Sequence, residues 1–202
     1  MILMLNCSYK EKDSNTRYFL ELLKNQVDEN VEIWNIKQVL NGGLEALEDK
    51  LEESKVFVIG TPLYVDGLPA QAVKLLELLF EKDRERFLGK RVYVVSNLGF
   101  YEGEQIRHLF DIVRNWCERM QMIYSGGLAI GAGPMISTLK EMSLKTGLNK
   151  DIGKGLETLA KAISEQRKID NYYAKTKIPR IVYLKAAHMT FRKALKENKK
   201  SN

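Results

Sequence analysis

The chain has 202 residues, of which 45% are hydrophobic and 29% charged, and it contains 4 prolines and 2 cysteines. These proportions exclude disordered, collagen-like and disulfide-stapled proteins, and the length suits one domain with an appendage. No apolar run approaches the roughly 20 residues of a membrane-spanning helix. The apolar start lacks a basic leader and a cleavage site, so it predicts a strand and not a signal peptide. Cys7 and Cys117 are isolated, which suits a reducing cytoplasm and excludes a four-cysteine cluster.

Positive charge is concentrated near the C-terminus. Residues 165–202 carry 11 Lys and Arg against 3 Asp and Glu, a net charge of +8, whereas residues 1–164 carry 21 against 23, a net charge of −2. The body of the chain is therefore nearly neutral, and the basic balance gives no reason to expect nucleic-acid binding.

Apolar runs of strand length alternate with segments of helical periodicity along the body. Strands are expected at residues 2–6, 31–36, 55–60, 91–96 and 122–130, and helices at residues 15–26, 44–51, 70–80, 104–119 and 150–167. This alternation predicts a parallel α/β sheet with helices on both faces. Such sheets bind ligands beyond the carboxyl ends of their strands, so the loops after the first, third and fourth strands form the candidate site.

The first loop, residues 7–16, places hydroxyl and amide side chains just before a helix, whose N-terminus favours anions. The residues that could bind a phosphate there are Ser8, Lys10, Lys12, Ser14, Asn15 and Thr16. The alternative is simple helix capping by Ser14 or Asn15, which accounts for fewer of these groups. The loop matches neither a Walker A motif nor the glycine pattern of a dinucleotide fold, so it predicts phosphate binding of another kind.

The second loop, residues 60–69, reads Gly-Thr-Pro-Leu-Tyr-Val-Asp-Gly-Leu-Pro. Its two prolines fix the backbone around an aromatic segment, which predicts a flat apolar surface beside a planar ligand. The alternative is an ordinary turn with Tyr64 in the core. The third loop, residues 97–104, mixes glycine with aromatic residues, and glycine permits close approach of backbone to a ligand. The alternative there is the lead-in to a helix.

These loops resemble those of the flavodoxin-like NAD(P)H-dependent FMN reductases. The most specific element is Thr61-Pro62-Leu63-Tyr64-Val65-Asp66-Gly67-Leu68-Pro69, which is similar to the flavin loop of that family. The resemblance spans about residues 1–165. It implies a flavodoxin-like three-layer sandwich with five parallel strands in the order 2-1-3-4-5, FMN at the strand ends, and NAD(P)H as the co-substrate.

The resemblance also implies which residues contact the flavin. The phosphate would be held by Ser8, Lys10, Ser14, Asn15 and Thr16. The isoalloxazine ring would be bordered by Pro62, Leu63, Tyr64 and Val65, and its pyrimidine edge by Asn97, Gly99 and Phe100. No catalytic side chain is expected, because hydride transfer belongs to flavin and nicotinamide. No metal site is expected either, since His108 and His188 are interpreted as helix-surface residues.

The tail, residues 166–202, is interpreted as a basic helical extension of an FMN-binding domain that spans residues 1–165. Pro179 predicts the start of a helix that continues to about residue 196. Its apolar stripe consists of Leu184, Ala187, Phe191, Ala194 and Leu195. Small residues in this stripe favour packing on the chain's own body or on a partner over contact with an anionic membrane surface. The sequence thus favours a homodimer bridged by its tail helices.

The expected function is FMN-dependent oxidation of NADH or NADPH in the cytoplasm, with electrons passed to a small-molecule acceptor such as a flavin or quinone. One alternative is a flavodoxin-type electron carrier without direct NAD(P)H turnover, although the nearly neutral body is unlike a strongly acidic flavodoxin. Another alternative is a flavin-free binding or signalling domain built on the same sheet.

Overall fold

The computed structural model describes residues 1–82, 84–132, 144, 146–174 and 176–200. Its centre is one sheet of six parallel strands in the order β2-β1-β3-β4-β5-β6. The strands are β1 (Ile2–Asn6), β2 (Val31–Asn35), β3 (Val56–Pro62), β4 (Arg91–Asn97), β5 (Ile123–Ile130) and β6 (Tyr172–Ala174). The order of the first five strands confirms the expected 2-1-3-4-5 arrangement.

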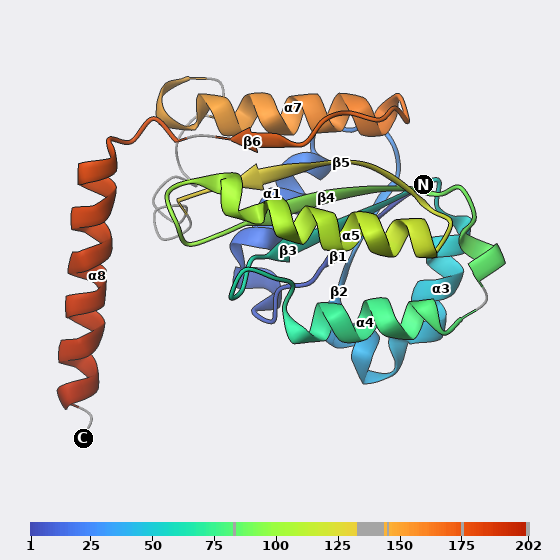
Figure 1. Cartoon of the computed structure of the whole chain (residues 1–202), viewed down its shortest axis with the longest axis horizontal. Helices are drawn as coiled ribbons and strands as arrows, with labels where there is room; N and C mark the ends of the chain where they lie inside the picture. The colour runs from blue at the N-terminus through green and yellow to red at the C-terminus, as the bar shows by residue number, and fades with distance from the viewer. Residues whose placement is uncertain (83, 133–143, 145, 175, 201–202) are drawn as a thin grey trace.

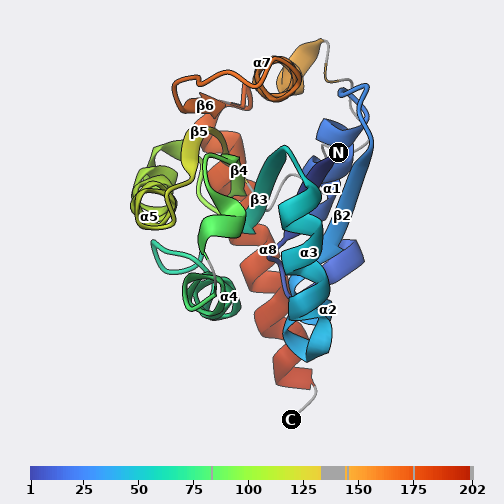
Figure 2. The same cartoon turned by 90° about the vertical axis from the view of Figure 1, so that its right-hand side faces the viewer.

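Helices cover both faces of this sheet. The α-helices are α1 (Asn15–Lys24), α2 (Ile36–Gln38), α3 (Leu44–Glu53), α4 (Ala70–Phe80), α5 (Arg107–Arg119), α7 (Lys150–Ser164) and α8 (Arg180–Lys200). Shorter helical segments are η1 (Glu11–Asp13), η2 (Val39–Gly43), η3 (Arg84–Phe87), η4 (Gly103–Ile106) and η5 (Gly147–Asn149). Figures 1 and 2 show α7 on one side of the sheet and α4 and α5 on the other.

The core lies in two layers because successive side chains of a strand point to opposite faces. Met4 belongs to the apolar cluster that includes side chains of α1 and α7. Leu3 and Leu5 belong to the cluster that includes side chains of α3, α4 and α5. All five residues of β1 are buried, as expected for a central strand covered on both faces.

The sheet has six strands and not the predicted five, because residues 172–174 add a parallel strand beside β5. The strand, Tyr-Tyr-Ala, follows a polar stretch and is only three residues long, so it lacks the longer apolar run that marks a strand in sequence. Contacts on both faces hold it in place. The Tyr172 hydroxyl donates to Asp151 of α7 over 2.7 Å, and the Tyr173 ring centroid lies 6.0 Å from that of Phe110 on α5. The sheet therefore extends into the segment that sequence analysis assigned to a helical tail.

The C-terminal helix α8 forms as predicted but stands apart from the body, as Figure 1 shows. Among its described side chains, Tyr183 is buried, at 4% exposure. Exposed apolar side chains of α8 are Ile181, Val182, Leu184, Met189 and Leu195. The predicted stripe is thus uncovered by the chain's own body at Leu184, and the side chains of Phe191 and Ala194 lie outside the described residues. No helix in the described part of the chain is long and apolar enough to cross a membrane.

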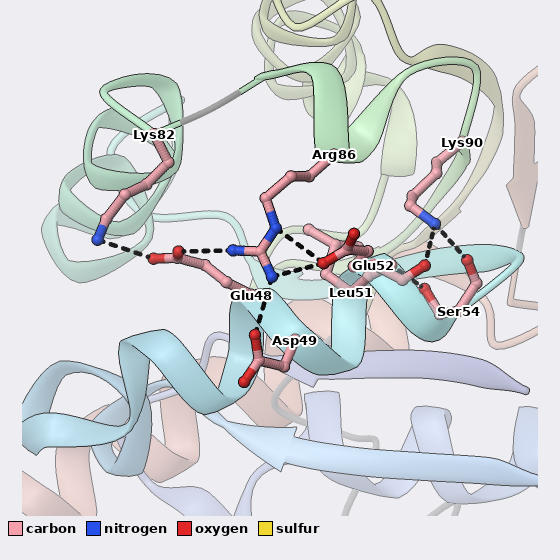
Figure 3. A network of polar contacts seen from close by, with 8 residues as sticks. All are labelled: Glu48, Asp49, Leu51, Glu52, Ser54, Lys82, Arg86 and Lys90. Carbon is pink, nitrogen blue, oxygen red and sulfur yellow. Dashed lines mark hydrogen bonds and ion pairs between the residues drawn. The ribbon is translucent and has the colours of Figure 1, made fainter.

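A polar network ties α3 to the segment that precedes β4, as Figure 3 shows. Arg86 pairs with three carboxylates of α3, those of Glu48, Asp49 and Glu52, at 3.5, 2.8 and 2.6 Å. The Lys90 ammonium donates to the carbonyl oxygen of Glu52 at 2.6 Å, near the end of the same helix. These residues precede β3 and β4 in the chain, so the network joins α3 to η3 near the amino ends of these strands, the edge of the sheet opposite to their carboxyl ends.

Candidate functional site

A cavity of about 280 Å³ opens at the carboxyl ends of β1, β3 and β4. Its lining residues are Ser8, Lys10, Asp13, Ser14, Asn15, Thr16, Pro62, Leu63, Tyr64, Asn97, Leu98 and Gly99. In the strand order, β2 lies on one side of β1 and β3 on the other, so the chain reverses direction across the sheet at this point. Doubly wound sheets bind their ligands at such a switch point.

The first loop takes its shape from Asn6, the last residue of β1. Its amide nitrogen donates to the Glu11 carbonyl at 3.0 Å and to the Asn35 side-chain oxygen at 3.1 Å. Its side-chain oxygen accepts from the Ser8 backbone N–H at 3.2 Å. Asn6 is fully buried, so these bonds replace the water that its amide would otherwise bind. Sequence analysis missed this residue, although a polar side chain closing an otherwise apolar strand was a usable signal.

Two hydroxyl groups of the first loop already have partners within the protein. Ser14 caps α1, where its hydroxyl oxygen accepts from the Arg17 N–H at 3.0 Å and its O–H donates to the Glu11 carbonyl at 2.9 Å. The Thr16 hydroxyl donates to the Asn97 side-chain oxygen at 2.8 Å. The first hydroxyl thus serves the capping role that sequence analysis kept as an alternative. The second joins the first loop to the third across the floor of the cavity.

The second loop is a two-residue hairpin. Tyr64 and Gly67 exchange backbone hydrogen bonds of 3.0 Å, and Val65 and Asp66 between them have φ angles of 46° and 59°. Positive φ at both central positions marks a type I′ turn, which favours asparagine and glycine. A β-branched residue in this region is strained. Because Val65 is fully exposed, no packing within the described chain compensates for that strain, and we interpret the tip as shaped for a ligand or partner.

Replacing Val65 with asparagine is expected to stabilise the flavin-free protein by about 1 kcal/mol, because asparagine tolerates positive φ far better than valine. Urea unfolding measures the change. Val73→Asn is the control, since Val73 is 41% exposed on helix α4 and has no positive φ. Equal losses of stability in both variants would show that the hairpin stores no strain.

The third loop supplies the remaining wall of the cavity. The Asn97 carbonyl accepts from the Leu63 N–H at 2.9 Å, which joins the second and third loops. Gly99 lines the cavity and is exposed. A Cβ added at Gly99 would meet no atom within 4 Å, so a small side chain would fit at this position. Asn97 thus joins the third loop to both other loops, through its side chain to Thr16 and through its carbonyl to Leu63.

The side chain of Lys12, a further candidate for phosphate binding, lies outside the described residues. Of the twelve residues implied as flavin contacts, the structure brings ten together around the cavity, with two exceptions. Val65 and Phe100 do not line the cavity, and they are 100% and 59% exposed on the same edge of the molecule. The cavity also includes Asp13 and Leu98, which sequence analysis did not name. Their positions depend on how η1 and the third loop fold over the strand ends.

Both cysteines are buried. Burial raises the pKa of the Cys7 thiol to about 12, and it raises the pKa of the Cys117 thiol to about 12 as well. Thiols with such a pKa stay protonated at neutral pH, and the thiolate is the nucleophilic form. Neither cysteine is therefore suited to covalent catalysis, although Cys7 begins the first loop.

The raised thiol pKa values predict that stability falls between about pH 9 and pH 12. Unfolded thiols ionise near their ordinary pKa of 9.0, whereas the folded thiols keep their protons until about pH 12. Unfolding then releases protons, and the free energy of unfolding drops by roughly 1.4 kcal/mol per pH unit for each thiol. Urea unfolding of Cys7→Ala and Cys117→Ala should show a shallower decline than wild type. Parallel declines in all three proteins would contradict this expectation.

The cavity fits the chemistry of FMN, which joins a charged phosphate to a flat and largely apolar ring. Its α1 end offers Ser8, Lys10 and the helix N-terminus, groups that bind phosphate. Its other end offers Pro62 and Tyr64, with Tyr64 half-exposed beside the opening. The polar and apolar ends thus match the two parts of the cofactor.

A parallel sheet of this order, with a cavity at its switch point, defines a flavodoxin-like α/β protein. The family model of the NADPH-dependent FMN reductases matches residues 1–134. The chain therefore belongs to the NADPH-dependent FMN reductase family, and it is a flavin-dependent oxidoreductase with FMN as cofactor and NAD(P)H as reductant.

Solved structures show the same fold. An oxidoreductase from Corynebacterium diphtheriae aligns with TM-score 0.60 and 14% identity over 81% of this chain and 94% of that one. A NADPH-quinone reductase from P. pentosaceus aligns with TM-score 0.58 and 16% identity over 81% of this chain and 97% of that one. A Streptococcus pneumonia TIGR4 flavodoxin aligns with TM-score 0.59 and 14% identity over 82% of this chain and 98% of that one. Such identities establish the fold alone, and no curated protein matches the sequence.

Proposed function

We propose that this protein transfers a hydride from NAD(P)H to FMN and then reduces a second small molecule, such as a free flavin or a quinone. The observation that carries the proposal is the cavity at the switch point of β1 and β3, polar at one end and apolar at the other. Solved structures of the same fold include a NADPH-quinone reductase and an azoreductase from Bacillus anthracis, which supports a small acceptor.

In this proposal the protein binds, orients and shields the cofactor. FMN, when bound, supplies the hydride-transfer chemistry. Ser8, Lys10 and the α1 N-terminus would hold the phosphate, while Pro62 and Tyr64 would border the ring and exclude water from one side. Backbone N–H groups of the third loop would stabilise negative charge on the ring edge. Because both substrates would share one exposed ring face, we expect ping-pong kinetics.

The test is the visible spectrum of the purified protein, followed by anaerobic addition of NADPH or NADH. We expect a yellow protein whose flavin absorbance bleaches within one turnover and returns when a quinone is added. A colourless protein that binds no added FMN would overturn the proposal in favour of a flavin-free domain. Bound FMN that neither NADPH nor NADH reduces would favour a flavodoxin-type carrier, a class with structural neighbours here.

We also propose a cytoplasmic homodimer in which α8 of each subunit covers an apolar groove of the other. That groove, of about 590 Å³, lies between α4 and α5, where Phe80 and Ile112 are exposed beside Glu77 and Glu81. One face of α8 carries the complementary set of Ile181, Leu184, Lys185, His188, Met189 and Arg192. Mutual exchange of the two helices would give a closed two-fold assembly.

Charge reversal tests this arrangement. Sedimentation should show that Lys185→Glu with Arg192→Glu converts the dimer to monomer, and that Glu77→Lys with Glu81→Lys in the same chain restores it. A wild-type monomer at micromolar concentration would overturn the dimer. Binding of that monomer to anionic vesicles would revive the membrane interpretation of the tail. The division into an FMN-binding domain over residues 1–165 and an extension over residues 166–202 stays a prediction.

A further inference from the structure

The start of the C-terminal helix is bonded to the third loop of the flavin cavity. The Tyr183 hydroxyl donates to the Gly99 carbonyl, and the Tyr101 hydroxyl donates to the Ile178 carbonyl at 2.6 Å. The two tyrosine ring centroids lie 5.4 Å apart. Arg180 pairs with Glu102 at 3.4 Å. Contacts thus run in both directions between the two segments.

These contacts enclose a small apolar cluster of their own. Ala132, Ile178 and Tyr183 are buried, at 0%, 3% and 4% exposure, with Tyr101 and Leu148 packed against them. By contrast, the other described side chains of α8 are exposed or half-buried. The first turn of α8 is therefore docked on the body even though the rest of the helix stands away from it. The family match ends at residue 134. On the α8 side of this contact, Ile178, Arg180 and Tyr183 therefore lie beyond the matched residues, whereas Ala132 and the third loop lie within them.

We propose that Tyr183 is a positioning residue of the flavin site, because its hydroxyl fixes the Gly99–Phe100 peptide in the cavity wall. This inference rests on the proposed function of that cavity. Gly99 lines the cavity, is exposed and has no side chain that could pack, so the orientation of its backbone depends on hydrogen bonds such as the one from Tyr183. Glycine is also the residue with the greatest backbone freedom.

Fixing one carbonyl fixes an N–H group as well. The peptide unit is planar and trans, so the Phe100 N–H points opposite to the Gly99 carbonyl that Tyr183 holds. The next carbonyl, that of Phe100, accepts from the Ala132 N–H at 2.5 Å, which fixes the following peptide in the same way. The loop thereby presents its N–H groups in one orientation, as a preorganised site for negative charge requires. The first turn of α8 therefore holds the backbone of the third loop in place, although no described residue of α8 lines the cavity itself.

The test compares Tyr183→Phe with Tyr124→Phe in the full-length protein. Each change removes one hydroxyl that donates a hydrogen bond, and the Tyr124 hydroxyl donates to Asn171 at 2.6 Å near the amino end of β5. Fluorescence titration with FMN should show a dissociation constant about three- to tenfold higher in Tyr183→Phe, the range for one net hydrogen bond, and a wild-type value in Tyr124→Phe. The midpoint potential of bound FMN should fall in Tyr183→Phe alone.

Hydrogen exchange in the flavin-free proteins supplies a readout that needs no cofactor. Amides of residues 98–102 should exchange faster in Tyr183→Phe than in wild type or Tyr124→Phe. Unchanged exchange in this loop would overturn the inference, whether or not the protein binds FMN. Faster exchange with unchanged FMN affinity and potential would also overturn it, because the contact would then be structural. Wild-type protein that binds no FMN would instead refute the proposed function.

Discussion

Replacing Asn6 with leucine is expected to destabilise the protein by about 2–4 kcal/mol and to weaken FMN binding at least tenfold. Leucine fills a similar volume but leaves the Ser8 N–H and the Asn35 side-chain oxygen without their partner, and the Glu11 carbonyl keeps only its hydrogen bond from Ser14. Each buried polar group without a hydrogen bond costs about 1–3 kcal/mol. The loop can recover part of this loss only by moving, which would displace the groups proposed to hold the phosphate.

Urea unfolding of the flavin-free protein and titration with FMN measure the two effects. Asn25→Leu is the matched control, because Asn25 is exposed at the C-terminal end of α1, whereas the cavity lies at the N-terminal end of that helix. We expect that variant to bind FMN like wild type. If Asn6→Leu retained wild-type FMN affinity, the first loop would not depend on Asn6 for its binding geometry.

Replacing Gly131 with alanine is expected to cost about 3 kcal/mol. The added Cβ would lie 2.3 Å from the Tyr101 carbonyl oxygen and 3.2 Å from the Gly103 backbone nitrogen. Both are backbone atoms, so the third loop itself must move, and a forced backbone shift is among the more costly consequences of a substitution. FMN affinity should fall as well, because the displaced segment continues into the cavity wall at Gly99.

Gly99→Ala provides the control for steric crowding, since its Cβ would meet nothing within 4 Å. Thermal unfolding of the two flavin-free variants should therefore separate them clearly, with Gly99→Ala close to wild type. Equal melting temperatures would mean that the third loop is not held against the end of β5.

Most secondary-structure elements could be predicted, because the spacing of apolar residues along each segment indicates which of its sides is buried. Helix α4 was expected at residues 70–80 and occupies Ala70–Phe80, where apolar residues recur at helical spacing. Strand β3 is buried along its whole length, so it reads as an apolar run. The parallel topology followed from the alternation of these elements, since each crossover needs a helix.

The spacing of apolar residues did not predict two local structures, strand β6 and the hairpin at Val65. Strand β6 has three residues, too few for a periodic signal, and its place beside β5 depends on packing against α5 and α7. The hairpin at Val65 opposes its own residue preference, because valine disfavours the positive φ that the turn requires. Strand β6 is thus decided by contacts made elsewhere in the fold, whereas the Val65 turn is closed by the backbone hydrogen bonds between Tyr64 and Gly67, against the preference of valine.

The sequence by itself predicted which loops line the cavity, because the carboxyl ends of parallel strands meet at one edge of the sheet. It also indicated the class of cofactor, through the resemblance of those loops to a flavin-binding family. Only the tertiary structure decided which polar atoms form hydrogen bonds with one another. Thr16 meets Asn97 across 81 residues, and Tyr183 meets Gly99 across 84. Hydrophobic periodicity reports whether a side chain is buried, whereas the partner of a hydrogen bond is fixed only when distant segments come together in space.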